Sequence, residues 1–327
     1  MAKLSRPRKG SLQFYPRKRA AKFIHSINFS AIKSNSSDSV LGFLTYKVAM
    51  ATAMTKDLTE KSITLNKRIF VPVTILEAPS MKIFSIRFYK SNRVIKDIII
   101  SNDKELKRKL KVPKFVKDIT KDSPNPESYD DLKIIVYSQP KETSIKKTPD
   151  LIELAVSGQN KEAKLNYIKS LAGKSLDVSE FLKSTDESKL IDVRGVTKGK
   201  GFSGPVKRFG INLRANKSEK GVRNVGSLGP WHPARVTFRA PIAGQLGIFS
   251  RISYNHKLMK FGRISEKDIN PSHGFKNYGK IRTSYIIVKG SVPGPSKRPV
   301  VLTPSLRPTK HRKKKKFEFQ ELIIKWK

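Results

Sequence analysis

Glycines and basic side chains alternate in residues 195–208, which read GVTKGKGFSGPVKR. Glycine allows a backbone to come close to a phosphate group, and the interleaved lysines and arginines supply positive charge. A loop of this composition is typical of proteins that bind irregular RNA. The segment therefore predicts contact with a phosphate backbone.

The same segment contains the glycine spacing of a dinucleotide-binding loop, ending at Gly204, with Glu219 lying 20 residues beyond its first glycine. That motif needs a helix that opens at its third glycine. Pro205 follows directly and the helix-breaking Gly210 comes within two turns, so the context argues against a nucleotide cofactor. A P-loop is also excluded, because Lys200 is followed by glycine where Ser or Thr is required.

Residues 229–235, GPWHPAR, form a second candidate binding segment, flanked by Arg223 and Arg239. Two prolines and a glycine exclude a regular element, so Trp231 is expected on a stiff, irregular loop. Trp231 is either a core anchor or a ring that stacks on unpaired bases beside the imidazole of His232. We favour stacking, with the neighbouring arginines holding phosphate.

The rest of the sequence gives little support for catalysis or metal binding. The chain has no cysteine, which excludes disulfides, thiolate nucleophiles and Cys-based zinc sites. The acidic pairs at residues 130–131 and 186–187 are interpreted as solvated turns. Solvated or RNA-facing roles are favoured over zinc binding for four scattered histidines, His25, His256, His273 and His311. No catalytic residue, metal ligand, cofactor or small-molecule substrate is predicted.

The overall charge indicates a polyanionic partner. The 327 residues include 68 Lys and Arg against 26 Asp and Glu, a formal net charge of +42. A globule with this charge repels itself, and phosphate contacts that release counterions are the strongest common means of neutralising it. No apolar run reaches the roughly 20 residues of a membrane span, and residues 1–19 lack the apolar centre of a signal peptide. We therefore expect a nucleic-acid partner and no membrane.

The charges separate into zones along the chain. Residues 1–22 contain eight basic residues and no acid, and are not expected to fold alone. Residues 102–187 contain 17 basic and 15 acidic residues, as an ordinary solvated surface does. Residues 194–263 contain 15 basic residues and the single acid Glu219, so this zone is expected to face the polyanion. The basic tract at residues 310–316 indicates either a nuclear-type or nonspecific tract or a dedicated RNA contact.

The elements that must position these segments include several strands. Residues 69–76 and 81–89 are rich in β-branched and aromatic side chains and are separated by a turn, which predicts a hairpin. Further short strands are expected at residues 132–138, 190–196 and 284–289.

A helical insert is expected between these strands. A cap at Thr148 predicts a helix that ends before Gly158. A second helix is expected over residues 161–171, and a third begins at Asp177, with Glu180 completing a capping box. Strands that bracket helices predict a mainly β, α+β fold: one discontinuous β-barrel interrupted by a small helical subdomain, rather than two tandem domains.

Six motifs stand in a fixed order along nearly the whole chain. They comprise residues 7–12 with 16–19, 71–74, 196–202, 231–234, 243–245 and 289–295. Their order resembles the large-subunit ribosomal protein family L-three, and the chain length favours its archaeal rather than its eukaryotic type. Residues 45–52 read TYKVAMAT where the family usually reads GYKAGMTH, and the tail after Pro308 matches no motif.

The resemblance implies a six-stranded, translation-protein type of β-barrel on the subunit surface, with long basic N-terminal and central extensions that penetrate the RNA toward the peptidyl-transferase centre. Trp231 would then lie at the tip of the central extension. The implied role is structural and not enzymatic: binding large-subunit rRNA, supporting assembly and positioning RNA. The implied partners are that rRNA and neighbouring ribosomal proteins of the cytoplasmic ribosome, and any Mg²⁺ or K⁺ would be held mainly by RNA.

Seven segments are predicted on this basis. They are a basic N-terminal extension (1–38), the first part of the barrel (39–100), a helical or mixed inserted subdomain (101–188), a barrel strand with the Gly-rich loop (189–212), the central extension (213–240), the remainder of the barrel (241–295) and a basic tail (296–327). The predicted RNA-contacting residues are Arg6, Arg8, Lys9, Arg17, Lys18, Arg19, Lys198, Lys200, Lys207, Arg208, Arg214, Lys217, Lys220, Arg223, Trp231, His232, Arg235, Arg239, Arg251, Lys297 and Arg298.

Two other classes of function are weighed against this one. An RNA-modifying enzyme or nuclease would need a cofactor pocket or a metal-binding acid cluster, and the basic centre offers only Glu219. A DNA-compacting protein would coat a duplex with basic tails, whereas aromatic residues among glycines suit splayed RNA bases better.

Overall fold

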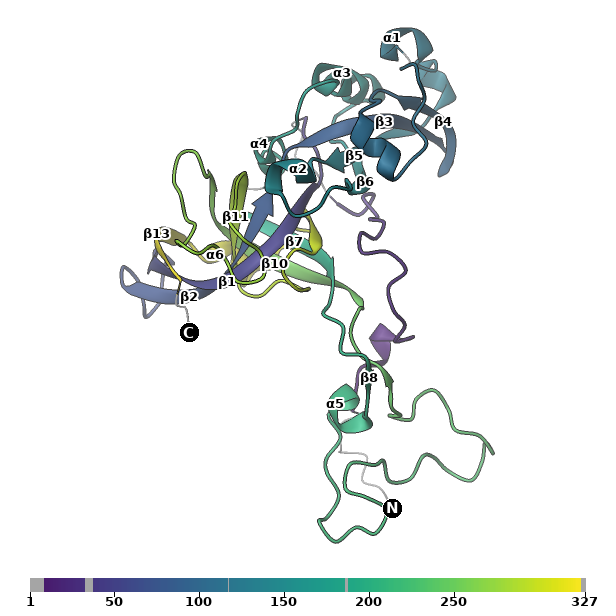
Figure 1. Ribbon diagram of the computed structural model, residues 1–327, viewed down its shortest axis with the longest axis vertical. Helices are drawn as coiled ribbons and strands as arrows, with labels where there is room; N and C mark the ends of the chain where they lie inside the picture. The colour runs from purple at the N-terminus through teal and green to yellow at the C-terminus, as the bar shows by residue number, and fades with distance from the viewer. Residues whose placement is uncertain (1–8, 33–37, 117, 186–187, 325–327) are drawn as a thin grey trace. The chain divides into compact units, whose positions relative to one another are not determined.

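The computed structural model describes residues 9–32, 38–116, 118–185 and 188–324 (Figure 1). The chain divides into two compact units. Unit 1 comprises Met1–Lys22 with Val196–Ser250, and unit 2 comprises Phe23–Gly195 with Arg251–Lys327. Each unit is therefore built from segments that are far apart in the sequence. Within the described residues, no helix has the length and apolar character needed to cross a membrane.

A ring of hydrogen-bonded strands forms the centre of unit 2. Its sheet has the order β12 (Pro299–Pro304), β7 (Leu190–Val196), β10 (Ser250–Arg263), β11 (Ser284–Lys289), β2 (Arg68–Ala78), β1 (Phe43–Asp57) and β13 (Phe317–Ile323). The first half of β1 also pairs with β12, which closes the ring, while its second half pairs with β13. Because β1 is long, it pairs with both β12 and β13 along the same edge, at different positions.

A second sheet of four antiparallel strands also belongs to unit 2. Its order is β4 (Arg93–Ile99), β3 (Met81–Lys90), β5 (Asp131–Ser138) and β6 (Leu151–Ala155). The α-helices of this part of the chain are α1 (Ile119–Asp122), α2 (Pro140–Thr143), α3 (Lys161–Leu171) and α4 (Val178–Leu182), with 3-10 turns η2 (Lys104–Arg108) and η3 (Pro126–Ser128). The insert that follows β2 is therefore mixed, and its core is a sheet.

Several predicted elements are confirmed. The helix at 161–171 is α3, and the strands at 132–138, 190–196 and 284–289 correspond to β5, β7 and β11. Asp177 does stand at the N-cap position of α4, but its side chain makes no cap hydrogen bond and instead accepts one from Arg263 Nη2 at 2.6 Å. The predicted capping box is therefore wrong, because both of its members, Asp177 and Glu180, are engaged by other side chains.

Two further predictions are corrected by the sheet pairing. β2 and β3 are strands, but they belong to different sheets, so the expected hairpin at residues 69–89 does not form. The helix expected before Gly158 is instead β6, in which Ile152 and Leu154 are buried while Leu151 and Glu153 are half-buried. This period of two fits a strand, and pairing with β5 overrides the helix-start signal at Thr148.

Buried polar side chains join distant segments of unit 2. Lys47 of β1 is buried and its Nζ donates to the carbonyl oxygens of Val292 at 2.5 Å and Gly294 at 3.1 Å. The hydroxyl group of Tyr46 donates to Asp150 Oδ2 at 2.7 Å, which joins β1 to the residue before β6. Paired polar groups of this kind fix the register of the strands around them.

Asp57, at the end of β1, is expected to make the stability of the protein depend on pH. Burial raises the pKa of its carboxyl group, but hydrogen bonds from Thr59, Thr64 and Ser62 outweigh this effect and lower the pKa to about 2 from 3.8. The folded pKa lies below the unfolded one, so the stabilisation is complete above about pH 5 and is lost as the pH falls through 2, with an upper limit of about 2 to 3 kcal/mol.

Chemical denaturation between pH 5 and about 2 should show this loss in the wild-type protein and a flatter dependence in Asp57→Asn. Glu60→Gln is the matched control, because Glu60 lies three residues away with an 82% exposed side chain. An Asp57→Asn protein with the wild-type pH dependence would contradict this role.

Candidate nucleic-acid interface

Unit 1 concentrates the positive charge of the chain. Its two segments contain 18 Lys and Arg residues and one acid, Glu219. Its regular elements are short: η1 (Leu12–Phe14), β8 (Phe202–Ser203), α5 (Pro205–Phe209) and β9 (Gly244–Gln245). So little regular structure leaves most of the basic side chains on irregular backbone.

Backbone hydrogen bonds at the ends of β8 and β9 hold the two strands of unit 1 together. Lys200 N donates to Leu246 O at 2.9 Å, and Leu246 N donates to Gly201 O at 2.8 Å. Gly247 has φ +80°, and a Cβ added there would lie 2.0 Å from Lys198 O. Only glycine fits this close approach. Ala20 N donates to Ile248 O at 2.8 Å, so the N-terminal segment is hydrogen-bonded to the backbone that follows β9 (Figure 1).

Two arginines organise α5 rather than face outward. The guanidinium of Arg17 lies 4.1 Å from the ring centroid of Phe209 and donates from Nη1 to Arg208 O at 2.8 Å. Arg208 donates from Nε to Gln245 O at 3.0 Å and from Nη1 to Ile242 O at 2.8 Å. Burial lowers the pKa of Arg208, and the nearby Arg17 lowers it further. These two residues, both predicted to contact RNA, thus hold unit 1 together.

The lysines beside them are free of such contacts. Lys198, Lys200 and Lys207 are exposed, and within the described residues none of their ammonium groups has a hydrogen-bond or ion-pair partner. Lys9 and Lys18 are exposed in the same way on the N-terminal segment. A polyanion could therefore reach these groups without breaking a protein contact.

The remaining predicted residues of unit 1 are Arg19, on the N-terminal segment, and a group along residues 210–243. Arg19 donates to the side-chain oxygen of Gln245 at 3.2 Å, and the half-buried Arg214 donates to Val225 O. The ring of Phe238 lies 5.9 Å from the guanidinium of Arg239. Five other predicted residues are exposed, namely Lys217, Lys220, Arg223, His232 and Arg235.

The indole of Trp231 is 87% exposed, so Trp231 is not a core anchor. Residues 228–231 and 233–236 line a shallow cavity of about 440 Å³ around it. Phe202 and Phe238 of the same unit are also exposed, at 82% and 67%. Exposed rings among cations match the composition of surfaces that stack nucleic-acid bases.

The glycine pattern at residues 199–204 lacks the setting of a dinucleotide-binding loop. β8 lies inside the motif, and α5 opens after Gly204 with Pro205 at its first position. Proline therefore starts this helix, contrary to its predicted role as a breaker. The helix ends after one turn at Gly210, which confirms that this glycine breaks the helix; its φ of +66° is left-handed.

Other predicted residues lie outside unit 1 or outside the described part of the chain. Arg251 and Arg298 are half-buried in unit 2, where the guanidinium of Arg298 lies 4.8 Å from the ring centroid of Phe23. Lys297 is exposed. Arg6 and Arg8, and the acidic pair at 186–187, fall outside the described residues. Most of the residues predicted to contact RNA therefore belong to unit 1, whereas Arg251, Lys297 and Arg298 belong to unit 2.

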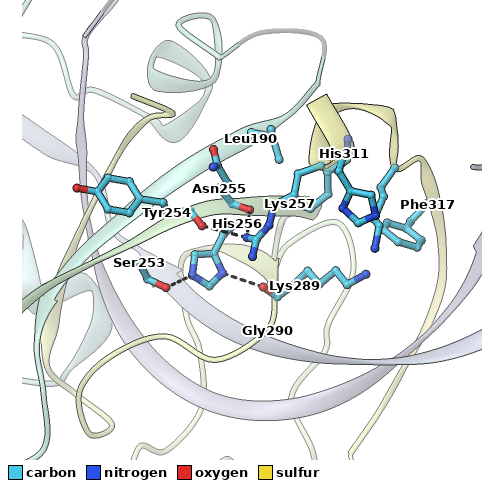
Figure 2. Close-up of a pocket in the computed structure, with 12 residues that line it drawn as sticks. Leu190, Ser253, Tyr254, Asn255, His256, Lys257, Lys289, Gly290, His311 and Phe317 are labelled. Carbon is cyan, nitrogen blue, oxygen red and sulfur yellow. Dashed lines mark hydrogen bonds between the residues drawn. The ribbon is translucent and has the colours of Figure 1, made fainter. Parts of the chain in front are cut away.

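The predicted environment of His256 is wrong. Its ring is buried, with Nδ1 2.8 Å from Lys289 O and Nε2 2.6 Å from Ser253 Oγ (Figure 2). Burial lowers its pKa, and the backbone contact opposes this only in part. His25 is half-buried, and burial and then Arg194 lower its pKa. Within the described residues, no three His, Cys, Asp or Glu side chains could hold a metal ion together.

Sequence reasoning missed a basic cavity in unit 2 (Figure 2). Its cationic lining residues are Lys257, Lys289, Arg312 and Lys315, which come from β10, β11 and the segment around α6 (Lys310–Lys314). The tract at 310–316 was noticed from its charge alone. The other residues that line the cavity could not be predicted to lie beside this tract, because strand β10 was not predicted and 55 residues separate Lys257 from Arg312.

A unit with this excess of positive charge, with exposed rings and with unpaired lysine ammonium groups is typical of the class of proteins that bind polyanions. The model of the family described as Ribosomal protein L3 matches residues 1–325, and the chain belongs to that family. It is accordingly a ribosomal protein of structural, non-enzymatic type.

Archaeal relatives resemble the chain along nearly its whole length. The large ribosomal subunit protein uL3 of Methanocaldococcus jannaschii is 39% identical over 319 residues, which cover 93% of this chain and 92% of the relative. The uL3 protein of Methanobrevibacter smithii is 40% identical, with 94% of each chain covered. That of Methanococcoides burtonii is 40% identical, with 91% of each covered.

Proposed function

We propose that the chain is a structural component of the large ribosomal subunit and that unit 1 binds large-subunit rRNA. The observation that carries this proposal is the composition of unit 1, with 18 basic residues against one acid. Relatives that are about 40% identical over more than nine-tenths of both chains bear the name large ribosomal subunit protein.

Two kinds of group in unit 1 suit two features of RNA. The free ammonium groups of Lys198, Lys200 and Lys207 neutralise backbone phosphates and release counterions. The exposed rings of Trp231, Phe202 and Phe238 stack on unpaired bases. Arg17 and Arg208 hold the backbone that presents these groups.

The segment around Trp231 serves, in this proposal, as the tip of an extension that positions RNA near the peptidyl-transferase centre and supports subunit assembly. In the same proposal, the ring of strands in unit 2 corresponds to a six-stranded β-barrel of the translation-protein type that the mixed insert interrupts. The pairing of β1 with β12 supports this, because it closes the ring and leaves β13 beside it. Neighbouring large-subunit proteins are further partners. The seven segments proposed from the sequence remain the working division of the chain.

Amide hydrogen exchange tests the proposal. Residues 214–235 contain few backbone hydrogen bonds, among them Arg214 N to Val222 O at 3.0 Å, so they should exchange rapidly in the free protein. They should become protected in assembled large subunits, as should residues 9–22. The amides of Lys200 and Leu246 serve as the internal control, because they are already hydrogen-bonded. Strong protection of residues 214–235 in the free protein, or none in the subunit, would contradict the proposal.

A further inference from the structure

The cavity in unit 2 has a volume of about 400 Å³, within the range of roughly 300–1,000 Å³ that is usual for ligand sites. Figure 2 shows side chains around it from β10, from the end of β11, from α6 (His311) and from the start of β13 (Phe317). Of the described residues that line it, none is acidic. Nearby carboxylates are already engaged: Asp192 accepts from Asn255 N at 2.8 Å and from Leu306 N at 2.9 Å.

The cations of this cavity repel one another. Burial lowers the pKa of Lys289, and Lys315, Arg312 and Lys257 lower it further, against an opposing effect of Asp57. Burial lowers the pKa of Lys257, and Lys189 and Lys316, which do not line the cavity, lower it further. The repulsion between like charges is relieved when an anion binds between them. His256 is held in place beside them, since both of its ring nitrogens are hydrogen-bonded, and burial lowers its pKa.

The protein fixes the position of two of these cations in advance. Arg312 Nη1 donates to Tyr254 O at 3.0 Å and to Asn255 O at 2.6 Å, which anchors the guanidinium to β10. Lys289 Nζ lies 3.9 Å from the ring centroid of Phe317. The ammonium group of Lys315 has no hydrogen-bond or ion-pair partner within the described residues. A fixed guanidinium beside two ammonium groups suits a phosphoryl oxyanion.

We propose that this cavity is a second RNA site, in which Arg312, Lys289 and Lys315 hold a backbone phosphate of an unpaired nucleotide. Tyr254 and Phe317 supply ring surface for its sugar or base. The aromatic lining favours a nucleotide over free inorganic phosphate. The inference rests on the proposed function, in that it takes RNA as the polyanion, but it concerns residues of unit 2 that are separate from the interface of unit 1.

Lysine acetylation read by mass spectrometry tests the site on the full-length protein. The reactivity of Lys289 and Lys315 is measured alone, with short single-stranded oligouridylate, and with inorganic phosphate at the same concentration of phosphoryl groups. We expect the RNA to lower both reactivities about tenfold and inorganic phosphate to change them less than twofold. Equal protection by inorganic phosphate would overturn the assignment to RNA.

Substitutions on α6 and just after it distinguish specific binding in the cavity from nonspecific electrostatic attraction. Lys315→Gln should remove most of the RNA protection of Lys289. Lys314→Gln removes the same charge one residue away, from an exposed side chain that does not line the cavity, and should leave the protection unchanged. If both variants behave alike, the site is wrong.

The same spectra distinguish this inference from the proposed function. Lys198 and Lys200 of unit 1 are read in the same samples. Protection at Lys198 and Lys200 without protection at Lys289 and Lys315 would reject the cavity and leave the proposed function standing. The absence of protection at all four lysines would count against both.

Discussion

The triple variant Lys198→Gln, Lys200→Gln, Lys207→Gln is expected to bind its rRNA fragment about a hundredfold more weakly near physiological salt, because three phosphate contacts are lost together. The slope of log affinity against log salt should become shallower by roughly 2 to 3. Protein stability should change little, since these side chains are exposed and their ammonium groups have no hydrogen-bond or ion-pair partner within the described residues. Filter binding over a range of salt concentrations gives both quantities.

The insert of unit 2 offers a control with the same change in charge. Lys104, Lys107 and Lys111 are exposed lysines in the near-neutral zone. Replacing all three by Gln should change the affinity and the slope far less than the unit 1 triple does. Equal effects of the two triples would mean that net charge alone drives binding and that the Gly-rich loop does not face RNA. Arg208 is left out of the test because its loss would disturb the fold of unit 1.

Trp231→Ala is expected to leave the free energy of unfolding within about 0.5 kcal/mol of the wild-type value. The indole is 87% exposed, whereas truncation of a core tryptophan would cost about 3 to 5 kcal/mol. RNA affinity should fall by about 1 to 3 kcal/mol, the contribution of one stacked base. Incorporation into large subunits, or their peptidyl-transfer activity, should fall with it.

Phe115→Ala is the control for removal of an exposed ring, because Phe115 is 85% exposed in unit 2. It should affect neither stability nor RNA affinity. A large drop in the melting temperature of Trp231→Ala together with normal subunit function would show that the indole is a core residue in solution.

Elements with a clear local pattern were predictable from the sequence. The helix α3 has the composition and the Gly173 stop of a helix, and β11 is a short β-branched run. β1 and β10 were missed because residues that are depleted in strands interrupt both of them: Ala, Lys and Asp in β1, and Lys, Asn and Gly in β10. Their pairing with β2, β11, β12 and β13 decides their structure. Such long-range pairing leaves little trace in a local pattern.

The candidate interface was predictable as a set of charges but not as a set of contacts. Neighbours in sequence differ in what they do: Lys207 is exposed, whereas Arg208 caps the carbonyl oxygens of Ile242 and Gln245. Arg17 packs on Phe209 while the adjacent Lys18 is exposed. A cation that holds the fold differs from an exposed, unpaired one only in the contacts made when segments about 190 residues apart in the sequence come together.

Co-sedimentation with large subunits through a high-salt wash tests the central claim most directly. A structural component that binds rRNA through many phosphate and stacking contacts should remain in the pellet at about one copy per subunit, under conditions that remove loosely held factors. The triple lysine variant should be released at lower salt than the wild type and than the control triple. Complete release of the wild-type protein by that wash, with the subunit otherwise intact, would contradict the account.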